Sequence, residues 1–242
     1  MSRLRSQIWH TILSLLLLAL TGVLIAWAYM QYQNPDSLPI RQVKVEGEIR
    51  HLKNAEIEQA IAPLVTTGFF TLRVNRIRQT LLAMPWVKEV TVRRIWPDTL
   101  VLKVEEQKPV ARWGKDALVN EESKLFFPNS GSIPTNLPLL FGPEEQVDVV
   151  LNQFESMNEA LKPLQVQLTR LTLSERRAWD GELDNEIVLR FGRDAVDERL
   201  QRFLVLYPQI VGHQALQNIS YMDLRYTNGI AVGVGPENNE NF

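Results

Sequence analysis

The sequence predicts an α+β protein with a single transmembrane helix, and two observations lead to this prediction. Residues 11–30 carry no charged side chain and, at 1.5 Å per helical residue, can cross the hydrocarbon core of a bilayer. The residues that follow change between helical and strand periodicity, which is typical of α+β domains. The chain contains no cysteine, so these domains must be stabilised by burial and hydrogen bonding without disulfides.

The apolar span has the features of an uncleaved anchor. Arg3 and Arg5 precede it, and the first basic residue beyond it is Arg41, so the positive-inside rule predicts a cytoplasmic tail (1–10) and an exported remainder. A cleaved signal peptide is the alternative, because Ala26–Ala28 has the spacing of a cleavage site. We favour the anchor because the span is longer than the usual apolar core of a signal peptide.

Composition and motifs argue against several function classes. The formal net charge is −2 with acidic and basic residues interspersed, so we expect no nucleic-acid partner. The exported part has no phosphate-cradling glycine loop, no nucleophile elbow and no metal-ligand cluster, so we expect no catalysis, no cofactor, no metal and no small-molecule substrate. His51 and His213 are expected to be solvated loop residues.

The first exported domain, residues 38–106, is predicted to have the order β-α-α-β-β. Val43 and Val45 alternate in a first strand, and two short amphipathic helices follow. We expect Asn54 and Asn75 to cap these helices, and Pro63 and Pro85 to end them. Alternating apolar residues then predict a hairpin that reverses at residues 96–98.

The second exported domain, residues 108–235, is predicted to be an antiparallel sheet with two helices. A surface connection is expected at 128–143, and a bulge at 169–170 is expected to separate two strands. Asp194 is a candidate cap for the second helix, and the last hairpin should turn at Asn228-Gly229. Its expected elements are a hairpin at 117–127, helices at 147–161 and 194–207, and strands at 164–168, 171–173, 179–183, 187–191, 219–226 and 230–234. Residues 236–242 are expected to be a disordered polar tail.

Several motifs occur together in a recognisable order: Leu38-Pro39-Ile40, Pro85-Trp86-Val87, Val90-Thr91-Val92-Arg93-Arg94, Trp96-Pro97-Asp98, Pro109 to Trp113, Leu140 to Glu144, Leu206-Tyr207-Pro208 and Asp223 to Tyr226. With them the chain resembles the FtsQ/DivIB family of bacterial cell-division proteins. The resemblance implies that residues 38–106 form a POTRA domain. It also implies a non-catalytic divisome scaffold in the cell inner membrane at the septum, with a periplasmic C-terminus. The implied partners are FtsB, FtsL and other divisome proteins.

The last strand is the candidate docking edge for a partner. As the final element of an antiparallel meander it has no later strand to cover its backbone groups. Tyr226 is the expected aromatic anchor, Gly229 and Gly233 should allow close backbone approach, and the resemblance implies that Arg193 pairs with a carboxylate of FtsB. The candidate residues are Arg193, Arg225, Tyr226, Asn228, Gly229, Ile230, Val232, Gly233 and Val234. Val234 stands where relatives often have tryptophan.

The resemblance also implies a second contact region in the first domain, with Val92 and Arg94 as candidates. Core packing is an equally good account of Val92. Another POTRA-bearing class, a periplasmic chaperone or outer-membrane assembly factor, is the main alternative function, and the lack of an internal repeat disfavours it. A soluble periplasmic ligand-binding protein released after Ala28 is a further alternative, which the mass of the mature protein would distinguish.

Overall fold

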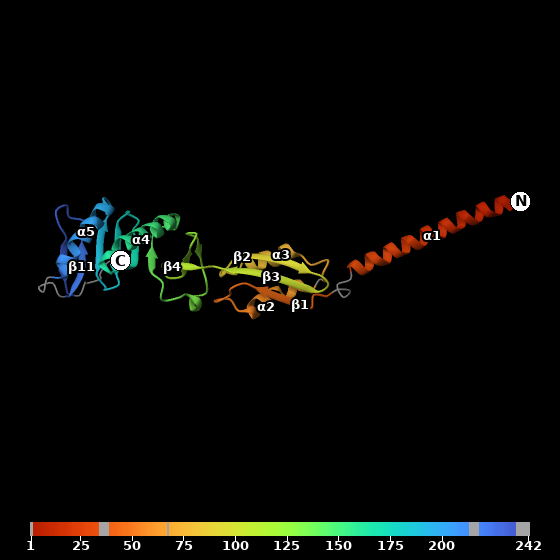
Figure 1. Cartoon of the computed structure of the whole chain (residues 1–242), viewed down its shortest axis with the longest axis horizontal. Coiled ribbons are helices and arrows are strands. Elements are labelled where there is room, and N and C mark those ends of the chain that lie inside the picture. The colour runs from red at the N-terminus through yellow and green to blue at the C-terminus, as the bar shows by residue number, and fades with distance from the viewer. Residues whose placement is uncertain (1, 34–38, 67, 213–217, 236–242) are drawn as a thin grey trace. The chain divides into compact units, whose positions relative to one another are not determined.

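The computed structural model describes residues 2–33, 39–66, 68–212 and 218–235 (Figure 1). The chain divides into two compact units, residues 1–107 and 108–242. The first unit begins with helix α1 (Ser2–Gln33). Within it, Ile12–Met30 has a mean hydropathy of 2.3 and no buried side chains, and by length and composition it can cross a membrane. One apolar helix near the N-terminus is therefore present, as the sequence predicts.

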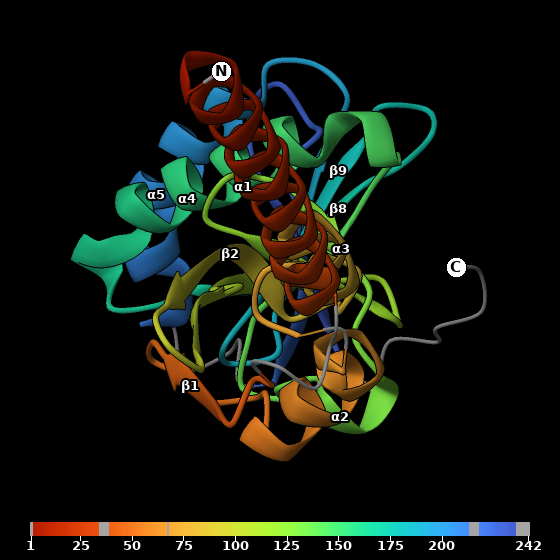
Figure 2. The same cartoon turned by 90° about the vertical axis from the view of Figure 1, so that its right-hand side faces the viewer.

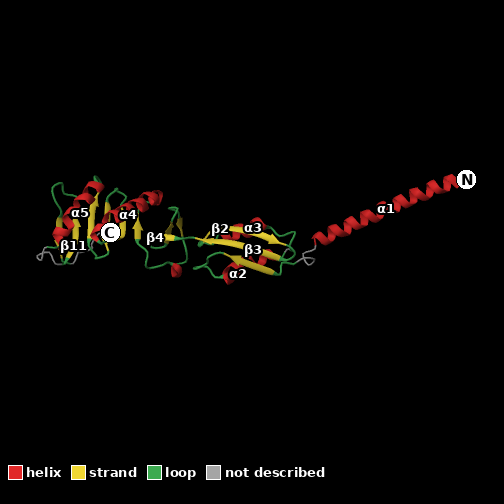
Figure 3. Cartoon of the chain, viewed as in Figure 1, coloured by secondary structure: helices red, strands yellow, loops and turns green. Residues whose placement is uncertain are grey.

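The predicted POTRA domain, in the first unit, has a three-stranded sheet in the order β1-β3-β2. Strand β3 lies between a parallel β1 and an antiparallel β2. Ile57 and Ile61 of the first helix and Ile77 and Leu81 of the second are buried. The elements are β1 (Gln42–Glu46), α2 (Asn54–Val65), α3 (Val74–Leu82), β2 (Val87–Ile95) and β3 (Thr99–Glu106). The predicted order β-α-α-β-β is confirmed (Figure 3).

The predicted helix boundaries in this domain need correction. Lys53 and Arg73 occupy the N-cap positions, and neither side chain makes a capping hydrogen bond. Asn54 and Asn75 lie inside the helices, so their predicted capping roles are wrong. Pro63 lies in the last turn of α2, where a missing N–H removes only one helical hydrogen bond and the helix continues to Val65.

The second unit is built on a nine-stranded sheet in the order β12-β11-β10-β9-β8-β7-β4-β5-β6. Its strands are β4 (Pro109–Trp113), β5 (Ala117–Asn120), β6 (Leu125–Phe126), β7 (Leu139–Phe141), β8 (Leu168–Leu173), β9 (Trp179–Leu183), β10 (Val188–Gly192), β11 (Ile219–Asp223) and β12 (Ala231–Val234). Its helices are α4 (Val147–Leu161) and α5 (Val196–Val211). Two strands were not predicted: β4, and β7 within the expected surface connection at 128–143.

The sheet is mixed, and the prediction of an antiparallel sheet is wrong. Strands β7 and β8 are parallel, and so are β10 and β11. In each pair a helix joins the two strands, α4 in the first and α5 in the second. A helix of this length returns the chain to the end of the sheet at which the first strand began, so the next strand runs in the same direction. Strand β4 also pairs in parallel with β7.

The core of the second unit lies between the sheet and its two helices. Phe203, Leu200 and Tyr207 of α5 and Met157 and Leu161 of α4 are buried in one cluster with inward-facing strand residues. Figure 2 shows α4 and α5 near one another in this unit. Burial on this face leaves alternate strand residues on the opposite face of the sheet.

Both ends of α5 and the last hairpin also differ from their predictions. Ala195, with φ +54°, occupies the N-cap position of α5, so the predicted Asp194 cap is wrong. Pro208 lies inside the helix, and the Gly212 N–H donates a hydrogen bond to the Pro208 carbonyl at the end of the helix. Strand β11 ends at Asp223, and neither Asn228 nor Gly229 has positive φ. The expected tight Asn-Gly turn is therefore a longer loop, residues 224–230.

Strand β8 begins only at Leu168, because Lys162–Leu164 forms a 3₁₀ turn and Gln165 is left-handed with φ +57°. The two strands predicted for this segment are one strand. The predicted bulge is present, as a register shift between Leu168 and Arg170. The expected disordered tail at 236–242 and the expected loop histidine, His213, lie outside the described residues.

Candidate partner-binding edge

Strand β12 lies at one end of the nine-stranded sheet. It pairs with β11 in antiparallel register, with Ala231 opposite Asp223 and Val232 opposite Met222. Within the residues that the structure describes, no strand pairs with its other side, so that side presents backbone N–H and C=O groups at the edge. The opposite end of the sheet is β6, which has two residues. Strand β12 is thus the longer of the two edges.

The glycine in β12 makes room for an aromatic ring of the neighbouring strand. A Cβ atom built on Gly233 would lie 1.9 Å from the Tyr221 ring, so the ring of Tyr221 covers the glycine. The guanidinium of Arg190, on β10, lies 4.7 Å from the centroid of the same ring. The space that a side chain at position 233 would occupy is therefore filled by the Tyr221 ring. Close approach of a partner backbone at Gly233 stays a prediction.

The loop between β11 and β12 exposes the expected anchor. The side chain of Tyr226 is large, apolar over most of its surface and 61% exposed. Arg202, on α5, donates hydrogen bonds through Nη1 to the carbonyls of Tyr226, Thr227 (3.1 Å) and Gly229 (3.4 Å). A charged donor shared among several carbonyls of a loop stabilises one backbone conformation. Arg202 thus holds the segment that presents Tyr226.

A second arginine of α5 supports the same loop from its other end. Arg199 donates through Nη1 to the Phe191 carbonyl at 2.5 Å and through Nη2 to the Arg225 carbonyl at 3.4 Å. The motifs of the sequence did not single out Arg199 or Arg202. Both lie on a helix among other polar residues, and nothing in local periodicity reveals that their donors reach a loop more than twenty residues further along the chain.

Arg225 is held at the edge by an ion pair with Asp223. Its Nη2 lies 2.5 Å from Oδ2 of the carboxylate, and its Nε donates to Oδ1 at 2.9 Å. Burial by itself would raise the pKa of Asp223, but hydrogen bonds from the side chain and backbone of Arg225, with the charges of Arg225 and Arg190, hold that pKa below its ordinary value. The Arg225 side chain is still 57% exposed and can offer a cation to a partner.

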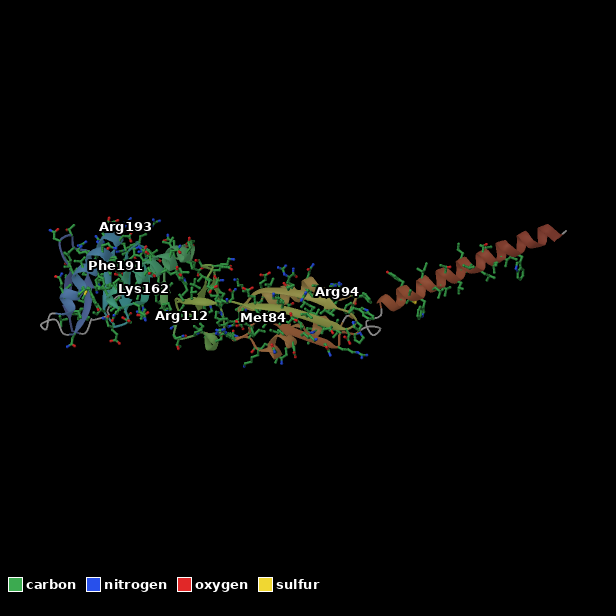
Figure 4. The ribbon with its side chains drawn as sticks, viewed as in Figure 1. Met84, Arg94, Arg112, Lys162, Phe191 and Arg193 are labelled. Atoms are coloured by element: carbon green, nitrogen blue, oxygen red, sulfur yellow. The ribbon has the colours of Figure 1, made fainter. Side chains whose placement is uncertain are left out.

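The remaining candidates of the edge occupy three places. Ile230, Val232 and Val234 continue from the loop into β12, where Val234 is 55% exposed. Asn228 and Gly229 lie in the loop. Arg193 is exposed in the turn between β10 and α5, two strands away from β12 in the sheet (Figure 4). The structure therefore brings the loop and the strand together, with Arg193 on a neighbouring turn.

In the POTRA domain, Arg94 has partners within its own chain. Its Nη1 donates to the carbonyls of Phe69 at 3.0 Å and Phe70 at 3.3 Å, and its guanidinium lies 5.8 Å from the centroid of the Phe69 ring. These contacts join the hairpin to the loop before α3 and give Arg94 a structural role. Val92 is half-buried opposite Leu102. Whether either residue also contacts a partner stays a prediction.

The same domain holds a buried carboxylate that no sequence motif indicates. Glu106, 7% exposed at the end of β3, accepts backbone hydrogen bonds from the N–H groups of Arg50 (2.9 Å), His51 (2.9 Å) and Leu52 (2.6 Å). Burial alone would raise the pKa of Glu106, but these hydrogen bonds and one from the His51 side chain lower it. His51 stacks on Trp86 with 3.9 Å between ring centroids, so it is not simply solvated. Trp86 is buried in the core, whereas Trp96 is 71% exposed at the corner between β2 and β3.

In the described part of the chain, no group of three His, Cys, Asp or Glu residues is placed to hold a metal ion. The arrangement at β12 is instead suited to strand addition, in which a partner strand pairs with the open backbone and side chains at the flanks supply affinity.

Comparisons with known proteins agree with this architecture. Residues 38–107 match the family described as POTRA domain, FtsQ-type, and residues 111–225 match the family described as Cell division protein FtsQ/DivIB, C-terminal. The chain is 38% identical over 199 residues to "Cell division protein FtsQ" of Coxiella burnetii, covering 82% of each chain. It is 35% identical over 229 residues to the protein of the same name from Escherichia coli, covering 91% of this chain and 83% of that one.

Proposed function

The chain belongs to the FtsQ/DivIB family of cell division proteins, and from this membership we propose that it is a divisome scaffold that docks the FtsB/FtsL pair on the edge of β12. As a member of this family it is a non-catalytic cell-division protein with a POTRA domain and one N-terminal apolar helix. The proposal adds the partner and the surface at which it binds.

The open edge of β12 is the observation that carries the proposal. A partner strand that pairs along it gains backbone hydrogen bonds of about 1 kcal/mol net each. A few such bonds barely offset the free-energy cost of association, so side chains must supply much of the affinity. The exposure of Tyr226, on a loop beside the strand that Arg202 holds in position, supports giving it this role. Rigid aromatic side chains at interfaces are frequent hot spots.

Charge complementarity supports the choice of an acidic partner segment. Arg225 is exposed beside the strand, and Arg193 is exposed on the neighbouring turn. Carboxylates of a docked segment would find hydrogen-bonding cations at both places. Val234 offers less contact area than the tryptophan common in relatives, which leaves Tyr226 as the main aromatic contact of this edge.

We also propose that α1 crosses the inner membrane with the N-terminus in the cytoplasm, so that both domains are periplasmic. Arg3 and Arg5 precede the span and give the charge asymmetry that sets orientation. Photo-crosslinking in vivo tests the docking proposal. A photoreactive amino acid at Val234 is expected to capture FtsB, whereas one at Val205, 65% exposed on α5, is a matched control expected to capture none. Equal capture from the two positions, or none from Val234, would contradict docking at β12.

A further inference from the structure

The tip of the POTRA hairpin exposes apolar side chains that the docking proposal does not use. Ile95 is 50% exposed and Trp96 is 71% exposed at the turn between β2 and β3. Phe70, 43% exposed, belongs to the same end of the domain, because Arg94 donates hydrogen bonds to the Phe69 and Phe70 carbonyls. Figure 4 shows Arg94 at this end of the POTRA domain and Met84 at the other. We call Phe70, Ile95 and Trp96 the hairpin tip.

The charges around the hairpin tip are mainly positive. Its own segments, residues 69–73 and 93–99, together with Arg41, contain four arginines and a single acid. The arginines are Arg41, Arg73, Arg93 and Arg94, all exposed. The acid, Asp98, is half-buried and accepts a hydrogen bond from the Thr99 hydroxyl at 3.2 Å. Aromatic side chains amid arginines are typical of surfaces that lie at the boundary between lipid headgroups and water.

The chain also ties this end of the domain to the membrane helix. The Arg41 N–H donates to the Asp98 carbonyl at 2.9 Å, so the chain enters the domain beside the hairpin tip. Helix α1 ends at Gln33. The stretch from Gln33 to Arg41 spans at most about 29 Å when fully extended, so Arg41 stays within that distance of the end of α1. The hairpin tip lies beside Arg41 and is therefore also held near the end of the helix. The opposite end of the domain has no such short tether to the helix.

We propose that the hairpin tip is a lipid-binding surface. Trp96, Ile95 and Phe70 enter the headgroup region of the bilayer that α1 crosses, and the surrounding arginines pair with the phosphates of anionic phospholipids. Short tethering makes the local concentration of bilayer surface high, so even a small apolar tip spends much of its time bound. The surface is separate from the β12 edge, and it would set the orientation of the POTRA domain at the membrane. The inference rests on α1 spanning the membrane.

Site-directed spin labelling of the full chain tests the proposal. Because the sequence has no cysteine, Thr71→Cys gives a single labelling site next to Phe70 of the tip, and Ala83→Cys gives a control label at the other end of the domain. Each variant is incorporated in nanodiscs of phosphatidylethanolamine and phosphatidylglycerol. Co-purification with the nanodisc reports insertion of α1 independently. The Thr71 label is expected to be several-fold less accessible to a water-soluble nickel chelate than the Ala83 label, and more accessible to oxygen.

A double substitution, Ile95→Ser with Trp96→Ser, removes the apolar tip at exposed positions where the fold does not need it, and its melting temperature checks this. In this variant the Thr71 label should be as accessible to the nickel chelate as the Ala83 label. With the tip intact, nanodiscs of phosphatidylcholine alone should protect the Thr71 label less than anionic nanodiscs do. Equal accessibility of both labels in anionic nanodiscs would overturn the proposal. Protection of the Thr71 label that survives the double substitution would also overturn it. If the variant in addition no longer supports cell division, the tip would be assigned to a protein partner.

Discussion

The ring of Tyr221 on β11 lies directly across Gly233 on β12, so close that a Cβ at position 233 would be 1.9 Å from a ring carbon. Glycine is therefore required in this strand by a neighbour within the chain. The contact covers the one place in β12 that lacks a side chain, and aromatic side chains are known to compensate for glycine in edge strands in this way. The conformation of β12 thus depends on a residue of the neighbouring strand.

Substituting Gly233 should destabilise this part of the sheet. Gly233→Ala forces the Tyr221 ring or the strand to move, at a cost of about 1–3 kcal/mol of unfolding free energy. Gly229→Ala is the matched control, because nothing lies within 4 Å of a Cβ there. Denaturant unfolding measures both. Combining Gly233→Ala with Tyr221→Ala should recover part of the loss, and strictly additive effects of the two substitutions would show that the ring is not the obstacle.

Removing the Arg202 side chain's charge should loosen the loop without unfolding the domain. Arg202→Gln loses charged hydrogen bonds to the Tyr226, Thr227 and Gly229 carbonyls, so amide hydrogen exchange across residues 224–230 is expected to accelerate. Binding of FtsB should weaken as a result. Arg193→Gln is the comparison: it should weaken binding through loss of a direct contact and leave exchange in the loop unchanged. Identical exchange in both variants would remove Arg202 from its positioning role.

Tyr226 should behave as a hot spot. Tyr226→Ala is expected to cost about 2 kcal/mol or more of binding free energy for the FtsB periplasmic segment, measured by titration calorimetry. The side chain is 61% exposed, so the melting temperature should hardly change. Val205→Ala, at a comparably exposed apolar position on α5, should leave affinity as it is. If a folded Tyr226→Ala protein binds with unchanged affinity, docking at this edge is refuted.

The buried carboxylate of Glu106 should make POTRA stability pH-dependent. Its folded-state pKa is below the ordinary value of 4.5, so the stabilisation is complete above that value and is lost as pH falls through the lowered pKa. At neutral pH, Glu106→Gln is expected to cost about 1.5–3 kcal/mol, the range for hydrogen bonds to a charged group. The loss should shrink as acid protonates the native carboxylate.

Glu105 provides the control for this measurement. It lies next to Glu106 on β3, is 53% exposed and pairs with Lys88 at 3.2 Å. An exposed ion pair contributes about 0–1 kcal/mol, so Glu105→Gln should have a small effect on the free energy of unfolding. Unfolding free energies measured from pH 3 to pH 7 would therefore separate the variants. A pH-independent cost of Glu106→Gln would mean that the charge of the carboxylate is unimportant.

Membrane orientation can be tested on the whole chain. A reporter that fluoresces only in the cytoplasm, fused after Phe242, is expected to be dark, because the positive-inside rule, applied to Arg3 and Arg5, predicts a cytoplasmic N-terminus. The same reporter fused before Met1 should be bright. A bright C-terminal fusion would contradict both the orientation and a periplasmic docking role.

Local patterns in the sequence were sufficient for much of the fold. The apolar span, the β-α-α-β-β order of the POTRA domain and the helix at 147–161 follow from periodicity, because each is determined by residues close together in the chain. The sequence also predicted that residues 230–234 form an edge strand, and β12 does lie at one end of the sheet that the structure describes, although the predicted antiparallel meander is wrong.

Tertiary structure decided the rest, because it depends on contacts between distant residues. Strand β7 has three residues, too few for a periodic pattern, and its place between β4 and β8 exists only in the folded sheet. The same is true of the parallel pairs, which arise from the return path through α4 and α5. Arg202 reaches from α5 to the loop between β11 and β12, and the Tyr221 ring on β11 covers Gly233 on β12. The sequence by itself determined which segment forms the edge strand. Contacts with distant residues determined the conformation of that strand and of the loop before it.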